Sequence, residues 1–233
     1  LLTEARAVTG DSVSAFELIP SLGVELVTKH FPGMTAPLDS RSPWYVLLEL
    51  TSPETGDGLK RRTETLLERA FSSGLVTDGT IAASEAQRDG LWHLREVLPE
   101  SQTREGGSIK HDVSVPVSCI PALIDRGTKA LEAALPGCRV FPFGHIGDGN
   151  IHFNVSQPIG ADKETFLKEW GRLNRIVHDI VADLGGSFSA EHGIGVLKKD
   201  ELRHYRSAVE LELMSRIKAA IDPARIMNPG KIL

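Results

Sequence analysis

The greatest concentration of chemically versatile residues is the segment Phe143–Asn154, which reads FGHIGDGNIHFN. Within it, Asp148-Gly149 is typical of a two-residue β-hairpin turn of type I′, which requires positive φ at both central positions. Counting outward from that turn places His145 directly opposite His152, with Cβ atoms about 4.5–5.5 Å apart on one face of a sheet. Two imidazoles at that separation can share one metal ion, and Asn154 projects from the same face. Either histidine alone would be interpreted as an ordinary sheet residue beside a turn, whereas the pair favours a site.

A second candidate segment reads GGSFSAEHGIG from Gly185 to Gly195 and places an acid and an imidazole side by side. Glycines let the backbone approach a ligand closely. The Glu191 carboxylate would complete a set of two histidines and one carboxylate with open coordination positions, which is typical of catalytic metal sites. His192 would then be a free base beside the metal. A glycine-rich loop with a solvated Glu191 and His192 explains this segment equally well.

Three stretches of the chain, FGHIGDGNIHFNV, SAEHGIGVLKKDEL and IDPARIMNPGKIL, resemble the C-terminal domain of the FAD-linked D-2-hydroxyacid dehydrogenases. This family of vanillyl-alcohol-oxidase-type flavoproteins includes D-2-hydroxyglutarate dehydrogenase, D-lactate dehydrogenase and the glycolate oxidase flavoprotein subunit. The resemblance covers nearly the whole chain, in order and in spacing. It implies that His145, His152 and Glu191 are ligands of a divalent metal, most often zinc, and that His192 is the general base.

The same resemblance extends to the substrate and to the flavin. The segment LREVLPESQTREGGSIKHDVSVP matches the family's substrate segment, and it implies that Arg95 and Lys110 hold the substrate carboxylate. Asn154 matches a residue that contacts the substrate, and Asn228 matches a residue near the flavin ring. Glu191 and His192 are implied to face the flavin as well. The chain departs from the family at Pro99, where a threonine is common, and one polar contact to the substrate is therefore missing.

Oxidation of a 2-hydroxy acid is chemistry that these residue types suit. The hydroxyl proton must be removed and the C2 hydride passed to a flavin. A metal bound to the hydroxyl oxygen lowers the pKa of that hydroxyl, and a neutral imidazole accepts a proton near neutral pH. A guanidinium binds a carboxylate through two hydrogen bonds, and an ammonium adds a point charge. Without the resemblance, Arg95 and Lys110 would each be interpreted as solvated surface cations.

The elements that must position these residues predict an α+β fold. Strand-like patterns alternate with helical ones, and the tight hairpin excludes a fully parallel sheet. We expect a ferredoxin-like, mostly antiparallel sheet with helices on one face, the cap domain of a vanillyl-alcohol-oxidase-type flavoenzyme. The expected strands are 14–19, 44–51, 76–83, 108–115, 139–145 and 150–156, and the expected helices are 20–30, 57–73, 84–98, 118–135, 162–184 and 207–221.

The expected organisation has three parts. Residues 1–12 form the end of a helix and a linker from an upstream domain, residues 13–221 form the substrate- and metal-binding cap domain, and residues 222–233 form a tail that returns toward the flavin. Because the chain contains neither a G-x-G-x-x-G nor a G-K-[ST] loop, we expect an FAD-binding domain upstream to hold most of the cofactor. The isolated chain is therefore expected to be inactive. The expected partners are that domain, a small 2-hydroxy acid, an unidentified electron acceptor and a second copy in a homodimer.

The amino-acid composition of the chain argues against some classes of function. The 233 residues carry a net charge of −5, with both signs distributed along the chain, which argues against a nucleic-acid partner. The sequence has no transmembrane-length apolar run and no targeting segment, and a cytoplasmic location of the bacterial type, or the mitochondrial matrix, is expected. Two alternatives to the dehydrogenase stay open. One is a metallohydrolase that uses the same histidines, and the other is a non-catalytic module that binds a metal or an acid.

Overall fold

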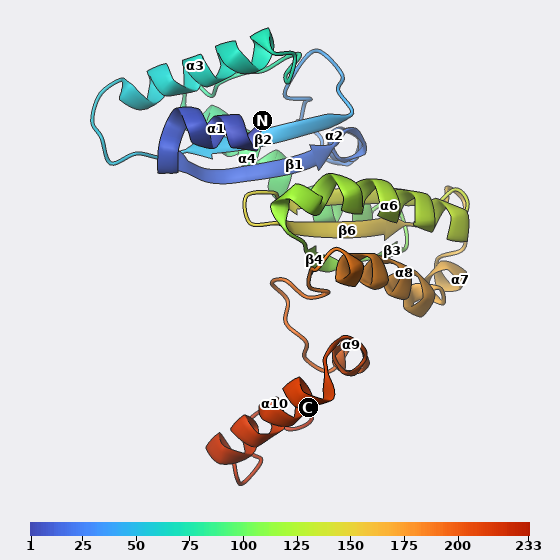
Figure 1. Ribbon diagram of the computed structural model, residues 1–233. Helices are drawn as coiled ribbons and strands as arrows, with labels where there is room; N and C mark the ends of the chain where they lie inside the picture. Colours follow the sequence, from blue (N-terminus) through green and yellow to red (C-terminus); the bar gives the residue numbers. More distant parts are fainter.

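The structure is a computed structural model that describes residues 1–233, apart from the side chain of Asp11. Its centre is a six-stranded antiparallel sheet in the order β2-β1-β5-β6-β3, with β4 also pairing with β6 (Figure 1). The strands are β1 (Val13–Pro20), β2 (Trp44–Leu50), β3 (Ser108–Ile109), β4 (Asp112–Ser114), β5 (Arg139–His145) and β6 (Asn150–Ser156).

The helices occupy the intervals between strands and the C-terminal third of the chain. They are α1 (Leu2–Thr9), α2 (Ser21–His30), α3 (Gly58–Ser72), α4 (Glu85–Glu96), α5 (Leu98–Thr103), α6 (Ile120–Ala134), α7 (Lys163–Leu167), α8 (Trp170–Asp183), α9 (Lys199–Tyr205) and α10 (Ala208–Ile221), with short 3-10 turns at Gly10–Ser12 and Val117–Cys119. Within the described residues, no helix is both long and apolar enough to cross a membrane.

Most of the expected elements are confirmed, and four expectations fail. Residues 76–83 form no strand and run as an irregular segment, with Ile81 47% exposed. The expected strand 108–115 is divided into β3 and β4. The expected helix 84–98 ends at Glu96, because Pro99 has no N–H to continue that helix and instead lies in the first turn of α5. The expected helix 162–184 is broken into α7 and α8, and α9 was not expected.

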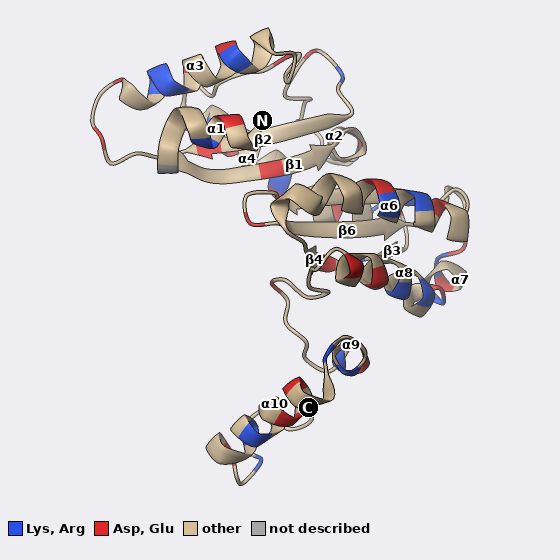
Figure 2. Cartoon of the chain, viewed as in Figure 1, with Lys and Arg blue, Asp and Glu red and all other residues tan. Residues whose placement is uncertain are grey.

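The two faces of the sheet carry different helices. Register places Phe16 of β1 on the same face as Phe153 of β6, and α1, α3, α6 and α8 pack on that face. Phe141 and Phe143 of β5 point to the opposite face, where Val27 of α2 joins them in a second buried cluster with α4 and α5. The antiparallel α+β fold is therefore as expected, with helices on the second face as well. Figure 2 shows acidic and basic residues together along α3, α6 and α8.

The β5–β6 hairpin differs from the expected two-residue turn. Phe143, and not His145, lies directly opposite His152, and the connection comprises residues 146–149. The reason is conformational, since Gly149 has a φ of 88° while Asp148 does not adopt the positive φ that a type I′ turn needs. The register is shifted by two residues. Because side chains alternate with a period of two, both histidines still lie on the same face.

The C-terminal region extends away from the sheet (Figure 1). α9 is tied to α8 through Glu201, which accepts hydrogen bonds from Arg175 and His178 at 2.7 and 2.8 Å. The tail 222–233 returns to the segment that follows His192, where Ile232 N–H donates to the carbonyl of Gly195. α10 carries an exposed apolar stripe at every fourth residue, made of Val209, Leu213, Ile217 and Ile221.

Candidate metal and substrate site

The first half of the candidate site is rigid because it stands on paired strands. His145 ends β5 and His152 lies near the start of β6, and their ring centroids are 5.9 Å apart. His152 is the more buried of the two, with 16% of its side chain exposed against 38% for His145. Burial lowers the pKa of His152 to about 4, and the nearby charge of Arg95 acts in the same direction. At neutral pH this imidazole is therefore uncharged, which is the form that binds metals.

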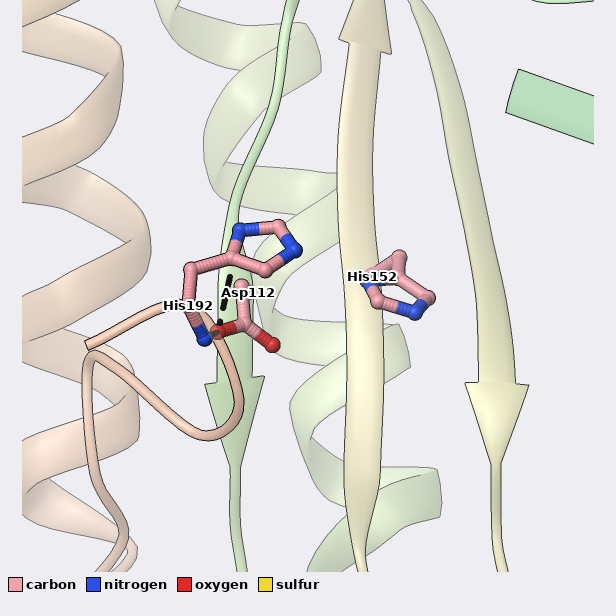
Figure 3. Close-up of side chains that lie close together, drawn as sticks. All are labelled: Asp112, His152 and His192. Carbon is pink, nitrogen blue, oxygen red and sulfur yellow. Dashed lines mark hydrogen bonds and ion pairs between the residues drawn. The ribbon is translucent and has the colours of Figure 1, made fainter. Parts of the chain in front are cut away.

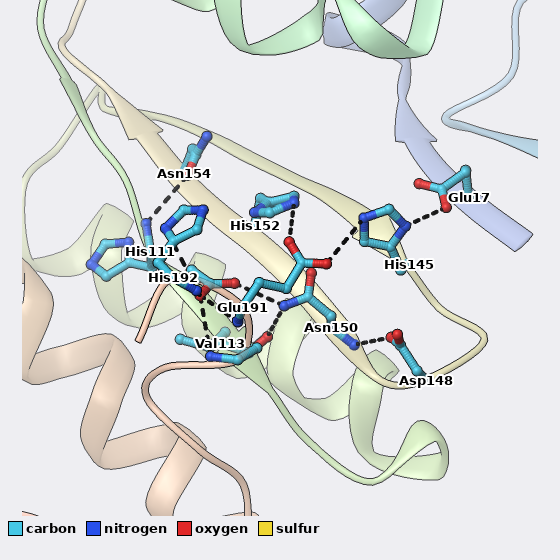
Figure 4. Close-up of polar contacts among 12 residues, drawn as sticks. Glu17, His111, Val113, His145, Asp148, Asn150, His152, Asn154, Glu191 and His192 are labelled. Atoms are coloured by element: carbon cyan, nitrogen blue, oxygen red, sulfur yellow. Dashed lines mark hydrogen bonds and ion pairs between the residues drawn. The ribbon is translucent and has the colours of Figure 1, made fainter. Parts of the chain in front are cut away.

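The second half comes from the loop between α8 and α9. Glu191 points toward both histidines (Figure 4), with Oε1 3.5 Å from His145 Nε2 and Oε2 4.0 Å from His152 Nε2. One ligand atom from each of the three residues lies within 4.8 Å of the other two. Zinc ligands stand about 2.0–2.2 Å from their ion, so that atoms at these separations suit one shared ion. The two-histidine, one-carboxylate set leaves coordination positions for a substrate.

Asp112 of β4 fixes the path of this loop. Its Oδ2 accepts hydrogen bonds from three consecutive backbone N–H groups, those of Ala190 at 3.2 Å and of Glu191 and His192 at 2.8 Å each. Its Oδ1 accepts from the Asn150 amide at 2.9 Å. Burial by itself raises the pKa of Asp112, but these donors outweigh it and hold the pKa below its usual value. The carboxylate therefore acts as an ionised anchor for the residues that carry the chemistry.

His192 lies beside the other groups and is open to solvent. Its side chain is 62% exposed, its Nδ1 is 3.8 Å from Asp112 Oδ2, and its ring stacks over that of His152 at 6.0 Å (Figure 3). Asp112, His152 and His192 also have ligand atoms within 4.8 Å of one another. Because Asp112 Oδ2 already accepts three N–H groups, the set with Glu191 fits a metal better. The role of His192 as a base stays a prediction.

Glu17 of β1 completes the floor of the site. It lies directly opposite His145 across the β1–β5 pair and is 1% exposed. Its Oε1 is 2.6 Å from His145 Nδ1, and its Oε2 accepts a hydrogen bond from Arg95 Nε at 2.6 Å. Arg95 in turn stacks over the ring of Phe143, 4.9 Å from the centroid. The structure thus brings Arg95 to the same face as both histidines.

The other sequence-predicted residues are placed less directly. Asn154 is buried on the histidine face, but its Nδ2 donates to Gln102 at 3.0 Å and its Oδ1 accepts from the N–H of His111 at 3.3 Å. Lys110 is exposed between β3 and β4, without an ion pair to any described residue. Asn228 is exposed in the tail and has a φ of 46°. The substrate and flavin roles of these three residues stay predictions.

Sequence reasoning missed Glu17 and Asp112. Each is a single acid inside a strand, Glu17 between Phe16 and Leu18 in SAFELIP and Asp112 in KHDVSV. A carboxylate in a buried strand is costly unless it is paired, so the sequence did contain a signal that partners exist. The partners themselves are distant in sequence, since Glu17 and His145 are 128 positions apart.

Comparison with known protein families shows the class to which the chain belongs. The family described as FAD linked oxidases, C-terminal domain, matches residues 2–232, and the chain belongs to this family. The resemblance inferred from the three motifs is thereby confirmed.

The relatives include several D-2-hydroxyglutarate dehydrogenases. The chain is 36% identical over its whole length to the mitochondrial enzyme of Arabidopsis thaliana, of which it covers 40%. It is 38% identical over 84% of its length to the enzyme of Stutzerimonas stutzeri, covering 42% of that protein, and 37% identical over 98% of its length to the mitochondrial enzyme of Bos taurus, covering 40%. The chain thus spans about two-fifths of the length of these curated relatives.

Proposed function

We propose that this chain is the substrate- and metal-binding part of an FAD-dependent dehydrogenase that oxidises a D-2-hydroxy acid of the D-2-hydroxyglutarate type to the 2-oxo acid. The observation that carries the proposal is the approach of Glu191 to both His145 and His152, with His192 next to it in sequence. The names of the relatives support D-2-hydroxyglutarate rather than D-lactate as the model substrate.

A divalent ion, zinc by the family resemblance, would be held by His145 Nε2, His152 Nε2 and the Glu191 carboxylate. When bound, it would supply Lewis acidity that lowers the pKa of the substrate hydroxyl. His192 accepts the hydroxyl proton on an imidazole nitrogen, for which its 62% exposed side chain leaves room beside the three metal ligands. Asp112 keeps the backbone of His192 in place while the proton moves.

The substrate carboxylate is bound by cations in this assignment. Arg95 uses its Nε for Glu17, and we assign its terminal Nη groups to the carboxylate, for which a guanidinium is geometrically suited. Lys110 adds a second positive charge from the exposed β3–β4 connection. Asn154 can contact the substrate only if the substrate displaces the hydrogen bond that Asn154 makes to Gln102 or to His111.

The remaining parts of the reaction lie with the rest of the enzyme. When bound, FAD would supply the acceptor for the C2 hydride and would be held chiefly by a separate domain, with Glu191, His192 and Asn228 of this chain assigned to contact it. An acceptor of unidentified chemistry would complete the turnover. The mitochondrial and bacterial relatives support a matrix or bacterial cytoplasmic location.

The test is reduction of the flavin in the complete enzyme. D-2-hydroxyglutarate is added anaerobically and the loss of visible flavin absorbance is followed, with the L-enantiomer, D-lactate and simple esters as comparison substrates. We expect bleaching by D-2-hydroxyglutarate in the wild type and in His204→Ala, which removes an exposed histidine of α9. We expect none in His192→Ala. Ester hydrolysis without bleaching would point instead to a metallohydrolase, and metal binding without either reaction would point to a non-catalytic module.

A further inference from the structure

Glu17 is a deeply buried charged side chain beside the candidate site, and no sequence motif pointed to it. Only 2% of its side chain is exposed, against 9% for its partner Arg95. Burial of a carboxylate is costly unless a charge and hydrogen bonds offset it. Both of its oxygens are engaged at 2.6 Å, one by His145 and the other by Arg95 (Figure 4 shows the His145 contact).

Resting on the proposed function, we propose that Glu17 is a positioning residue that couples the metal ligand His145 to the carboxylate-binding Arg95. Because a carboxylate is only an acceptor, His145 Nδ1 carries the proton in this contact. His145 Nε2 is then left with its lone pair toward Glu191, 3.5 Å away. A carboxylate behind a metal-bound histidine fixes the ring orientation in this way and raises its basicity.

The second oxygen gives Glu17 its coupling role. Arg95 Nε is held on the same carboxylate, and the Arg95 guanidinium is also packed over Phe143. These two contacts fix the orientation of Arg95, and neither uses its Nη groups as hydrogen-bond donors. A substrate carboxylate that moves Arg95 also moves Glu17, which orients His145. The metal ion and the substrate therefore each favour one arrangement of the Glu17 side chain.

The chain offers a matched control in Glu105. This carboxylate also joins a histidine to an arginine, with Oε1 2.5 Å from His30 Nε2 and Oε2 2.6 Å from Arg139 Nη1, and 11% of its side chain is exposed. Arg139 starts β5 whereas His145 ends it, a separation of about 20 Å along the strand. Glu105 also accepts a hydrogen bond from Lys29 Nζ at 2.6 Å, so it joins a histidine to an arginine with one extra cation and without access to the candidate site.

The experiment compares Glu17→Gln with Glu105→Gln in the complete enzyme. Glutamine keeps the shape but offers one acceptor oxygen and one NH2 donor, so it cannot accept from both partners. Zinc affinity is measured by chelator competition, substrate affinity and maximal rate by anaerobic flavin reduction, and stability by thermal unfolding. We expect both variants to lose stability. Only Glu17→Gln should weaken zinc binding, by about 10- to 100-fold, and raise the half-saturating concentration of D-2-hydroxyglutarate by more than it lowers the maximal rate.

Equal zinc and substrate affinities in wild type and Glu17→Gln would overturn the proposal and leave Glu17 a structural residue. Weaker zinc binding with unchanged substrate binding would overturn the coupling. If Glu17→Gln does not fold, Glu17→Asp keeps the charge but is too short to reach both partners, and the same two affinities are read from it. An enzyme that binds zinc through this site but does not oxidise a hydroxy acid would contradict the proposed reaction, while the response of zinc affinity to Glu17 still tests the positioning role.

Discussion

The two halves of the candidate site are built on different supports. His145 and His152 stand on neighbouring antiparallel strands, above the buried Phe141 and Phe143. Glu191 and His192 stand on a loop, and 48% and 62% of their side chains are exposed. The sheet half is fixed by the strand ladder and by packing, whereas the loop half is held by a few hydrogen bonds.

The two halves therefore differ in how firmly their side chains are held in place. The sheet half presents two imidazoles in a fixed arrangement, as a metal site requires. The loop half is more exposed, and its arrangement depends on Asp112, which accepts three successive N–H groups. Substitutions in the two halves should therefore affect turnover, metal binding and stability differently.

The largest effect is expected at His192. His192→Ala should lower turnover by about 10²- to 10⁴-fold while metal content stays that of the wild type, because a base is not a ligand. Glu191→Ala, at the neighbouring position, should lower both. Flavin-reduction kinetics and elemental analysis of the same samples provide the check. Equal loss of metal from both variants would mean that the roles of Glu191 and His192 are divided differently.

Asp112→Asn tests how the loop half is held. The amide NH2 cannot accept the N–H groups of Ala190, Glu191 and His192, so we expect faster hydrogen exchange at these amides and about a 10- to 100-fold fall in turnover. The control is Asp148→Asn, which alters a hairpin carboxylate that accepts a single N–H, from Asn150. Unchanged exchange at residues 190–192 in Asp112→Asn would contradict the anchoring role.

Acid should destabilise the protein through buried histidines next to the loop half. Burial lowers the pKa of His111 to about 3, and burial also lowers the pKa of His178. Since the folded pKa lies below the unfolded value of about 6.5, the unfolded chain binds the extra proton. Stability is therefore full above pH 6.5 and is lost as the pH falls, by about 2 kcal/mol at pH 5 from His111 alone.

Urea unfolding between pH 7.5 and pH 5 measures this loss. His204→Ala, which removes an exposed histidine, should leave the pH dependence unchanged. His111→Gln should make it shallower, whatever its effect on stability at pH 7.5. A flat dependence in the wild type would contradict a neutral, buried His111.

The smallest effect is expected from substitution of two glycines in the loop that carries Glu191 and His192. A Cβ on Gly186 would lie 2.1 Å from the carbonyl oxygen of Ser114, whereas a Cβ on Gly193 would meet nothing within 4 Å. Gly186→Ala should thus cost about 1–3 kcal/mol by displacing backbone. Gly193→Ala should cost about 1–2 kcal/mol, from its φ of 70° alone. The two thermal unfolding midpoints, measured together, rank them, and a larger loss in Gly193→Ala would contradict the packing of Gly186 on β4.

The sequence predicted the sheet half better than the loop half for a physical reason. A period of two placed His145 and His152 on one face even though the turn type was wrong, because an error of two residues preserves the face. Glu17 and Asp112 depend on pairing between distant strands, which no local pattern encodes. Where α4 ends before Pro99, a local rule was available from the sequence, because a proline cannot donate the hydrogen bond that continues a helix. The break between α7 and α8 was not predicted, and Trp170 at the start of α8 is 42% exposed.

The most direct test of whether the two halves form one centre is a crystal structure of the zinc-loaded complete enzyme, with anomalous diffraction at the zinc edge. We expect one ion, with His145 Nε2, His152 Nε2 and a Glu191 oxygen each at about 2.0–2.2 Å, and with His192 outside the coordination sphere. An ion held by Asp112 and His192, or no anomalous peak between β5, β6 and the 189–195 loop, would contradict this expectation.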